Sequence, residues 1–421
     1  MSNLVQHAAK PAVISDRALP SDGILDAVGN TPLVRLNRFL QTDDVELLVK
    51  LEYGNPGGSA KDRPATLMIA EALQRGDIDQ DSVVIESSSG NMGIGLAQAC
   101  RYHGIRFICV VDPRTQVQNL EIIAAYGGQI EMVHQPLGGD FLAARIARVC
   151  QLLESTPNSY WPNQYANPDN PRSHFEGTIA EIDRALDGQF DVLLVATSST
   201  GTAQGCRDYL RSIGRQTEVV AVDSAGSVLF GGAAGNRLIP GLGAGKEPPL
   251  ARGQCFDHVA KVSDLDCVVG CRRAAHTEAL LVGGSAGGVL LTVDRMKHQL
   301  AGRRCVAVLH DSGARYMQTV YNDDWVKEHL HCDAERLHRL VHGDPVPENL
   351  VHENLVHEDL VHENSGHENP SHDEDEVTTQ ALTVPHTPTS HAPASHRHPA
   401  PIVMISTPSP TKSLSTRCLA P

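Results

Sequence analysis

Residues 83–103 read VVIESSSGNMGIGLAQACRYH, and this stretch decides the fold. The run Val83–Glu86 is apolar and β-branched, and it is followed by three serines, a glycine and an apolar stretch with helical spacing from Gly93 to His103. This order is typical of a strand that passes directly into a helix. Because the first turn of a helix leaves backbone N–H groups free, the loop could bind an anion such as a carboxylate. The loop on its own could also be no more than a helix cap.

The same alternation of strand and helix recurs along the chain on both sides of this stretch. We predict further strands at Glu46–Leu51, Phe107–Val111, Gln129–Val133, Val192–Ala196, Val219–Val222 and Cys305–Leu309. We predict further helices at Ala65–Arg75, Leu120–Tyr126, Phe141–Ser155, Phe175–Leu186, Thr202–Ile213, Asp266–Leu281 and Gly288–Leu300. The pattern predicts an α/β protein with two parallel-sheet-based domains and helices on both faces. The turn-rich segment between Leu153 and Phe175 predicts a loop or crossing segment.

The last 80 residues, 342–421, differ in composition from the rest of the chain. They hold none of the 17 aromatic residues but 11 of the 25 prolines and 10 of the 21 histidines, and they carry −8 of the net charge of −15. A five-residue repeat begins at Val351 and matches neither the helix nor the strand period. We therefore predict a disordered, low-complexity, acidic His/Pro-rich tail. It is either a solvated appendage or a metal-collecting or pH-responsive segment.

The remaining chain divides into an N-terminal arm, 1–23, and a catalytic body, 24–341. We expect a smaller domain at about 62–165 and a larger domain from the rest of the body. No basic patch with interleaved aromatics suggests a nucleic-acid partner, and no apolar run is long enough to span a membrane. The N-terminus lacks a secretory pattern and the ten cysteines are scattered, so we expect a cytoplasmic protein. Cys267 and Cys271 lack a second pair, so no metal site is expected.

One lysine and a second hydroxyl-rich loop carry the chemistry. Lys61 lies in the segment 55–63, NPGGSAKDR, at the start of a predicted helix. There, burial and the helix N-terminal field would lower its pKa and make the amine nucleophilic, although a surface lysine at a helix start is the alternative. The loop 198–202, SSTGT, joins a strand to a helix and suits a phosphate. The glycines fit neither a dinucleotide fingerprint nor a P-loop. A lysine with carboxylate and phosphate loops instead fits pyridoxal phosphate (PLP) bound through the lysine.

These motifs occur together with GNTPLVRL at 29–36, two Asn-Pro pairs within 167–171 and GGSAG at 283–287. Over about residues 24–325 the chain resembles the cysteine synthase and cystathionine β-synthase family, which are fold-type II, tryptophan synthase β-like PLP enzymes. The resemblance implies a homodimer that acts on amino acids, with Lys61 as catalytic residue. It implies that the cofactor is bound by Lys61, Asn91, Ser198, Ser199, Thr200, Gly201, Thr202 and Ser285. It also implies that the substrate carboxylate is bound by Ser88, Ser89, Gly90, Met92 and Gln164.

The resemblance further implies the reaction type, which is β-replacement. The amine of a β-substituted alanine would displace Lys61, the freed lysine would take the Cα proton, the leaving group would depart and a second nucleophile would add. Ser285 faces the pyridine nitrogen in this family. Since a neutral serine does not hold that nitrogen protonated, elimination is favoured over transamination.

Departures from the usual cysteine synthases suggest which nucleophile is used. Met92 replaces a threonine, Tyr165 replaces a phenylalanine and a hydroxyl-rich loop replaces a glycine-rich one at 198–202. With the segment 138–145, these features resemble the branch of the family that joins O-phospho-L-serine to L-glutamate. Its product is N-(2-amino-2-carboxyethyl)-L-glutamate, a step toward 2,3-diaminopropionate for a siderophore or peptide antibiotic.

A dianionic phosphate leaving group requires a cation. We expect Arg145 to bind it, with Ser198 and Tyr165 hydrogen-bonding nearby, although Arg145 could also be a solvated helix residue. Two other functions stay open. One is a cysteine synthase that combines O-acetylserine or O-phosphoserine with sulfide, and the other is a non-catalytic binding paralogue.

Overall fold

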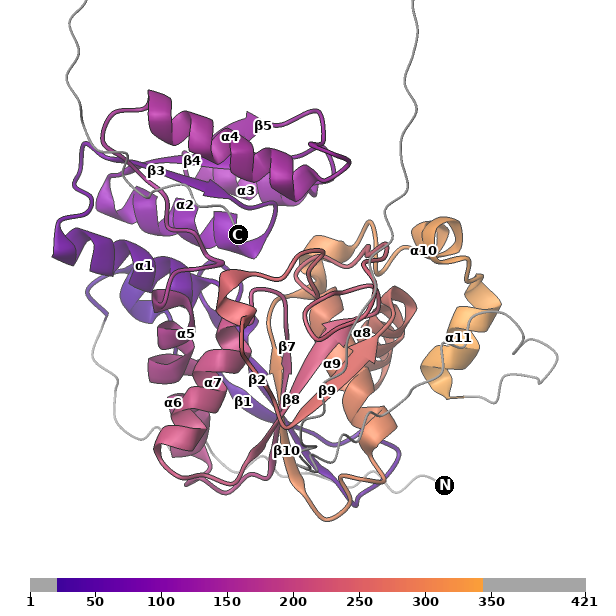
Figure 1. The fold of residues 1–421 in the computed structure, drawn as a ribbon. Helices are drawn as coiled ribbons and strands as arrows, with labels where there is room; N and C mark the ends of the chain where they lie inside the picture. The colour runs from indigo at the N-terminus through magenta and orange to yellow at the C-terminus, as the bar shows by residue number, and fades with distance from the viewer. Residues whose placement is uncertain (1–20, 344–421) are drawn as a thin grey trace, which may run out of the picture. The chain divides into compact units, whose positions relative to one another are not determined.

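The computed structural model describes residues 21–343. Most of the expected N-terminal arm, 1–23, and nearly all of the expected tail, 342–421, lie outside these described residues. The predicted disorder, the five-residue repeat and the metal-collecting alternative therefore lie outside them too. Within 21–343 the chain forms two sheets with helices on both faces, as the sequence predicted (Figure 1).

The larger sheet has six strands in the order β1-β2-β10-β7-β8-β9. Their bounds are Leu33–Leu36 (β1), Glu46–Leu51 (β2), Val192–Ala196 (β7), Glu218–Ser224 (β8), His258–Val262 (β9) and Arg304–Leu309 (β10). All neighbouring pairs are parallel except β1 and β2, which are antiparallel. The prediction of a parallel-sheet-based domain is thus confirmed, and the antiparallel strand β1 lies at the edge of the sheet.

The smaller sheet has four parallel strands in the order β5-β4-β3-β6. Their bounds are Val83–Ser87 (β3), Arg106–Val111 (β4), Gln129–Met132 (β5) and Ser159–Tyr160 (β6). Side chains alternate across β3: Val83 and Ile85 pack toward Val149 of the helix α4, while Val84 joins the core formed with the helices α1 and α2. Both faces of the sheet are therefore buried, as in other parallel sheets.

Four helices accompany the smaller sheet: Asp62–Arg75 (α1), Asn91–His103 (α2), Val117–Ala125 (α3) and Phe141–Ser155 (α4). The larger sheet is accompanied by Asp169–Ser173 (α5), Ile179–Ala185 (α6), Gly201–Ser212 (α7), Asp264–Glu278 (α8), Gly284–Met296 (α9), Asp323–Leu330 (α10) and Ala334–His342 (α11). Short 3-10 helices lie at Ile24–Ala27, Glu52–Gly54, Pro249–Ala251 and Gly313–Tyr316. Residues of α6 and α7 share one core with Leu193 and Val306, while α8 and α9 share the opposite one with Leu194 and Ala307.

Several elements differ from the prediction. The helix expected at 175–186 is instead a π-helical turn, His174–Thr178, followed by α6, and the preceding segment expected as a loop contains the strand β6 and the helix α5. Strands β1 and β9 were also missed; β9 has an exposed, mixed-polarity face that gives no apolar run. By contrast, β2, β7 and α4 have the predicted bounds.

A buried ion network fixes α1, and with it Lys61, to the larger sheet. Glu52, fully buried just after β2, accepts hydrogen bonds from Arg63 Nε (2.7 Å) and Nη2 (2.8 Å). Arg63 Nη1 also donates to Glu181 Oε1 of α6 (2.7 Å), and Lys50 Nζ donates to Glu181 Oε2 (2.6 Å). Burial acts to lower the pKa of Arg63, but Glu52 and Glu181 outweigh it and raise the pKa. Arg63 therefore stays charged near neutral pH.

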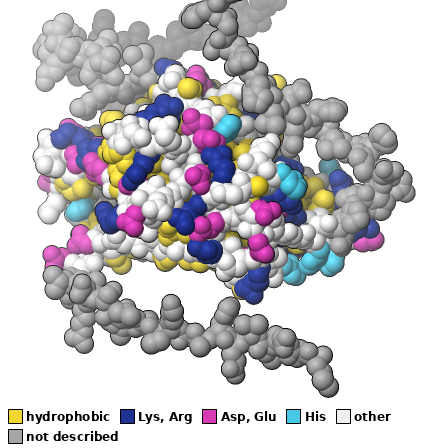
Figure 2. Space-filling view, turned by 90° about the horizontal axis from the view of Figure 1, so that it is seen from below, with side chains coloured by type: hydrophobic (Ala, Val, Ile, Leu, Met, Phe, Trp, Pro, Cys, Tyr) yellow, Lys and Arg dark blue, Asp and Glu magenta, His cyan; other side chains and the backbone are white. Residues whose placement is uncertain are grey.

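Within the described part of the chain, no helix combines the length and apolar character that crossing a membrane requires. Nor do residues 21–343 bring three or more His, Cys, Asp or Glu side chains into a group that could bind a metal ion. On the face shown in Figure 2, basic and acidic side chains are interspersed.

Candidate active site

One cavity lies where the carboxyl ends of strands from both sheets meet. The segments that follow β3, β7 and β10 all contribute to its wall, as expected at this edge of a parallel sheet. Every site residue expected from the sequence lines it: Lys61, Ser88, Ser89, Gly90, Asn91, Met92, Arg145, Gln164, Tyr165, Ser198, Ser199, Thr200, Gly201, Thr202 and Ser285. No Asp or Glu among the described residues is part of this lining.

Lys61 lies at the N-cap of α1, and the end of β10 holds its segment in place. Ala60 N donates to His310 O (2.8 Å), and Ser59 forms a backbone bridge with Asp311. The side chain is half-buried at the cavity wall. Burial lowers the pKa of the Lys61 amine, while Asp311 and Glu52 act in the opposite direction. A lysine amine with a lowered pKa is a better nucleophile and proton acceptor near neutral pH.

The serine-rich loop after β3 is folded back on itself by its own hydroxyls. Ser88 Oγ accepts a hydrogen bond from Gly93 N (2.9 Å), and Asn119 Nδ2 donates to Ser89 O (3.1 Å). Gln164 Nε2 donates to Ser87 O at 3.4 Å, which attaches the segment after β6 to this loop. The loop and the first turn of α2 therefore form one wall of the cavity, where free N–H groups suit a carboxylate.

A buried carboxylate, Glu86, supports this wall from behind. It accepts hydrogen bonds from Ser87 N (2.8 Å), Trp161 Nε1 (3.0 Å) and Gln164 N (3.2 Å). Burial raises its pKa to about 7, although these donors act to lower it. Glu86 therefore fixes the position of Gln164 relative to the serine-rich loop.

The loop Ser198–Thr202 meets the structural requirements of a phosphate site. Thr200 has a φ of +66°, in the left-handed region that non-glycine residues seldom adopt, and it is the N-cap of α7. At Gly201 a Cβ atom would lie 2.3 Å from Asn170 Oδ1, so only glycine fits. Thr202 Oγ1 hydrogen-bonds His174 Nε2 (3.1 Å). The first turn of this long helix thus presents unpaired N–H groups to the cavity, where they would hold the phosphate of PLP.

Asn170 connects the loop Ser198–Thr202 to the segment that follows β6. Its Nδ2 donates to Gln164 O (2.7 Å) and to Ser199 Oγ (3.3 Å), while its buried Oδ1 has no hydrogen-bond partner among the described residues. Ser285, in the first turn of α9, lines the same cavity and is buried. Lys61, the phosphate loop and Ser285 together fit PLP.

Three residues of this site were missed by sequence reasoning: His310, Asp311 and Tyr316. Asp311 Oδ2 accepts hydrogen bonds from Asn91 Nδ2 (2.9 Å) and from the Tyr316 hydroxyl (2.6 Å). His310 lines the cavity with both ring nitrogens buried and unpaired among the described residues, and burial, together with the charge of Lys61, lowers its pKa to about 3. The sequence signal that could have indicated Asp311 is its position directly after the apolar run of β10.

We predict that Asp311→Asn lowers turnover by about 10- to 100-fold, equivalent to the roughly 1.5–3 kcal/mol of hydrogen bonds to a charged group. The substitution removes the Asp311 carboxylate. In the unmodified enzyme this carboxylate orients Asn91, and its charge acts to raise the pKa of Lys61. The acid limb of the pH–rate profile should therefore move to lower pH. Tyr316→Phe is the control, because it removes one donor and keeps the charge. A turnover and pH profile equal to those of the unmodified enzyme would contradict this role.

Arg145 is buried in the lining of the cavity, which excludes the solvated alternative. It is 8% exposed, and its Nε lies 3.3 Å from Asp112 Oδ2. Tyr165 lines the same cavity, and burial raises the pKa of its hydroxyl while Arg145 acts to lower it. A guanidinium and a neutral phenol are thus both available to a second anion.

Comparison with known proteins agrees with this geometry. Residues 24–311 match the family model described as pyridoxal-phosphate dependent enzyme. The chain is 44% identical over 305 residues to the N-(2-amino-2-carboxyethyl)-L-glutamate synthase of Ralstonia nicotianae, covering 72% of this chain and 90% of that protein. It also resembles two solved structures. A hydrogen sulfide-producing enzyme from Fusobacterium nucleatum is 31% identical, with a TM-score of 0.66 and coverage of 70% of this chain and 100% of that one. The O-acetylserine dependent cystathionine beta-synthase from Helicobacter pylori is 28% identical, with a TM-score of 0.67 and coverage of 72% and 100%. The chain therefore belongs to the pyridoxal-phosphate dependent enzyme family and uses pyridoxal phosphate as its cofactor.

Proposed function

We propose that the protein joins O-phospho-L-serine to L-glutamate, giving N-(2-amino-2-carboxyethyl)-L-glutamate and phosphate by β-replacement. The observation that carries the proposal is the buried guanidinium of Arg145 in the same cavity as Lys61 and the phosphate loop. A cavity with two separate anion sites suits a substrate whose leaving group is itself a phosphate. The named activity of the Ralstonia relative supports the same assignment.

Lys61, Asn91, Ser285 and the loop Ser198–Thr202 would hold the cofactor. When bound, pyridoxal phosphate withdraws electrons from the substrate nitrogen and so makes the Cα proton acidic. The N–H groups of the serine-rich loop and of α2 would bind the substrate carboxylate, together with Gln164. Bound there, the substrate would lie in the cavity that Lys61 lines.

Lys61 would first accept the proton of Cα and later return a proton to Cα. Lys61 takes the Cα proton, and the bond between Cβ and the phosphate oxygen then breaks, with the electron pair leaving on phosphate. The amine of glutamate forms the new bond to Cβ, and Lys61 returns its proton to Cα. Asp311 favours the protonated form of Lys61 between these two steps, because the two charges attract.

Arg145 would bind the phosphate as it leaves. Asp112 orients its guanidinium through the contact at Nε, and Ser198 and Tyr165 would donate their hydroxyls to the same phosphate. These groups would stabilise the charge that builds up on the leaving oxygen.

A cysteine synthase is the second candidate, because the two solved structures above come from sulfur-metabolising enzymes. Incubation of the enzyme with O-phosphoserine and either glutamate or sulfide, followed by product mass analysis, separates the two. We expect the glutamate adduct. Rapid formation of cysteine without that adduct would show that sulfide is the nucleophile.

We predict that Arg145→Met lowers kcat/KM for O-phosphoserine by about 10- to 100-fold, from the loss of charged hydrogen bonds of roughly 1.5–3 kcal/mol. The rate with O-acetylserine, whose leaving group carries one charge, should change much less. Arg148→Met is the matched control, since Arg148 lies one turn along α4 and pairs with Glu131 at the surface. Equal losses with both substrates would show that Arg145 has only a structural role.

Several further assignments accompany this proposal. The enzyme would be a transferase that acts as a homodimer in the cytoplasm, with a smaller domain at about 62–165. Its product would lead to 2,3-diaminopropionate for a siderophore or a peptide antibiotic. Light scattering of the purified enzyme tests the oligomeric state.

A further inference from the structure

A second arginine, Arg237, lies on a loop that borders the active-site cavity. The loop follows β8, and its residues Pro240 and Gly241 line the cavity. Asp264 holds the backbone beside Arg237, accepting from Leu238 N (2.9 Å) and Ile239 N (3.2 Å). The position of Arg237 is therefore set by the start of α8.

Arg237 makes no ion pair with any described residue. Its Nη1 donates to Leu242 O at 3.3 Å, and its buried Nε has no hydrogen-bond partner. Burial lowers its pKa, although Asp223 and Asp264 act to raise it. Arg63 and Arg145, in contrast, each have a carboxylate partner. A half-buried guanidinium without a partner is costly unless a ligand supplies the missing anion.

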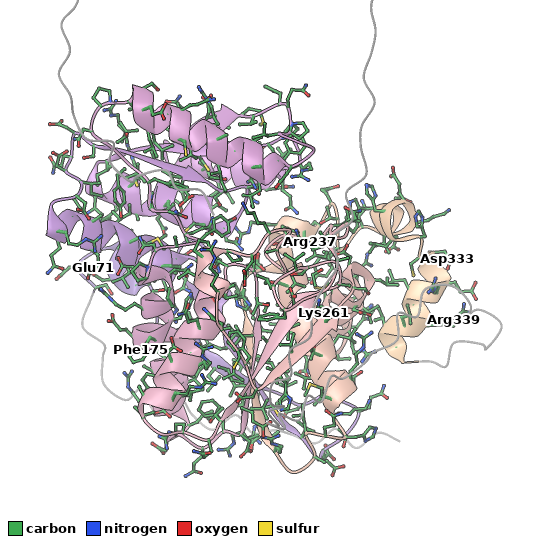
Figure 3. The ribbon with its side chains drawn as sticks, viewed as in Figure 1. Glu71, Phe175, Arg237, Lys261, Asp333 and Arg339 are labelled. Atoms are coloured by element: carbon green, nitrogen blue, oxygen red, sulfur yellow. The ribbon has the colours of Figure 1, made fainter. Side chains whose placement is uncertain are left out.

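The connection that contains Arg237 contacts Tyr165, which lines the cavity. Leu250 N, further along this connection, donates to Tyr165 O (3.1 Å). Figure 3 shows Arg237 on the side of the larger sheet's domain that faces the helices of the smaller one. Arg114, whose charge also acts on Arg237, is already paired with Asp112 and stacked over Phe141.

The chemistry of the second substrate requires such a cation. The amine of the acceptor must reach Cβ of the first substrate in the cavity that Lys61 lines. An acceptor with an acidic side chain carries a second carboxylate several bonds from that amine, and Arg145 cannot bind this carboxylate while it binds the leaving phosphate. A guanidinium matches a carboxylate with two parallel hydrogen bonds.

We infer that Arg237 binds the side-chain carboxylate of the acceptor amino acid and so selects a dicarboxylic acceptor. This inference rests on the proposed function, because it concerns the second substrate of that reaction. It adds an anion site to the two described above: Arg145 serves the leaving phosphate and Arg237 serves the acceptor.

The test uses the full-length holoenzyme and the variant Arg237→Gln. We expect the KM for glutamate to rise about 10- to 100-fold, as for loss of a charged hydrogen-bonded pair. The KM for O-phosphoserine should stay within about twofold, and the preference for glutamate over glutamine should disappear. Arg237→Lys keeps the positive charge but cannot form two parallel hydrogen bonds. Its KM for glutamate should lie between those of the unmodified enzyme and Arg237→Gln. Arg252→Gln is the matched control, because Arg252 is an exposed arginine on the same connection.

A binding measurement adds a readout that does not depend on turnover. Glutarate, a dicarboxylate without an amine, should raise the thermal midpoint of the unmodified holoenzyme and of Arg252→Gln, but not that of Arg237→Gln. An unchanged KM for glutamate in Arg237→Gln would overturn the inference, as would a rise in the KM for O-phosphoserine instead. If Arg237→Gln does not fold, Arg237→Lys provides the test: a raised KM for glutamate with an unchanged KM for O-phosphoserine supports the inference, and an unchanged KM for glutamate overturns it. The proposed function itself fails in a different way, when the unmodified enzyme makes no glutamate adduct.

Discussion

Replacing Lys61 by alanine is expected to lower turnover by about 10³-fold or more, because we propose that this one side chain both binds the cofactor covalently and carries the proton. The purified variant should also lose the visible absorbance of covalently held cofactor. Borohydride reduction of the unmodified holoenzyme should attach the cofactor to the peptide that contains Lys61, and peptide mass analysis can locate it. The variant should give no such peptide.

Lys261→Ala is the matched control. Lys261 lies on β9 and donates to Gly231 O (2.6 Å), away from the lining of the cavity (Figure 3). Its loss should leave absorbance and turnover unchanged. If the unmodified protein cannot be loaded with pyridoxal phosphate, the binding-paralogue alternative would gain support, whereas a fully active Lys61→Ala variant would overturn the role of Lys61.

Replacing Arg63 by methionine is expected to lower the free energy of unfolding by about 3–5 kcal/mol, because it leaves a buried carboxylate without its partner. Glu52 would lose both of its guanidinium hydrogen bonds while remaining fully buried. Urea unfolding at pH 7, followed by circular dichroism, measures the change. Arg215→Met is the control, since Arg215 pairs with Asp183 at the surface and should contribute less than about 1 kcal/mol. A loss of similar size in both variants would contradict the importance of burial.

From the same ion network we predict how the stability of the protein changes at acidic pH. Burial acts to raise the pKa of Glu181, but Arg63 and Lys50 outweigh it and lower the pKa to about 2 from 4.5. A depressed pKa contributes stability above pH 4.5, and that stability is lost as the pH falls from 4.5 toward 2. Arg63→Met should flatten this part of the stability profile. An unchanged slope would show that other carboxylates dominate acid unfolding.

The sequence was most informative where local signals and packing agree. Helix α4 has its predicted bounds, because Asp140 caps it, accepting from Leu142 N (2.7 Å), and because its apolar spacing suits a surface helix. The helix α5 was missed because its five residues, DNPRS, include an asparagine and a proline, which favour turns. It forms because its residues pack between α1 and α7, a tertiary effect that local propensity does not contain.

The residues of the candidate site could also be predicted where the signal is local in the sequence. Loops that pass from strand to helix could be identified because their small and hydroxyl residues are contiguous, and all of them line the cavity. Asp311 could not, because its partner Asn91 lies 220 residues away along the chain. Likewise, no local pattern indicates that Arg237 lacks a carboxylate partner, because that depends on side chains from several elements.

The position of β10 has a consequence for biosynthesis. This strand lies between β2 and β7 in the larger sheet, yet it is the last of the ten strands to leave the ribosome. Until residues 304–309 have been synthesised, β2 and β7 have no neighbour between them, and each exposes edges that can pair wrongly. The smaller sheet, whose strands lie between Val83 and Tyr160, has no such gap. The nascent chain can therefore fold in two stages, with the cofactor site complete only after translation has passed Asp311.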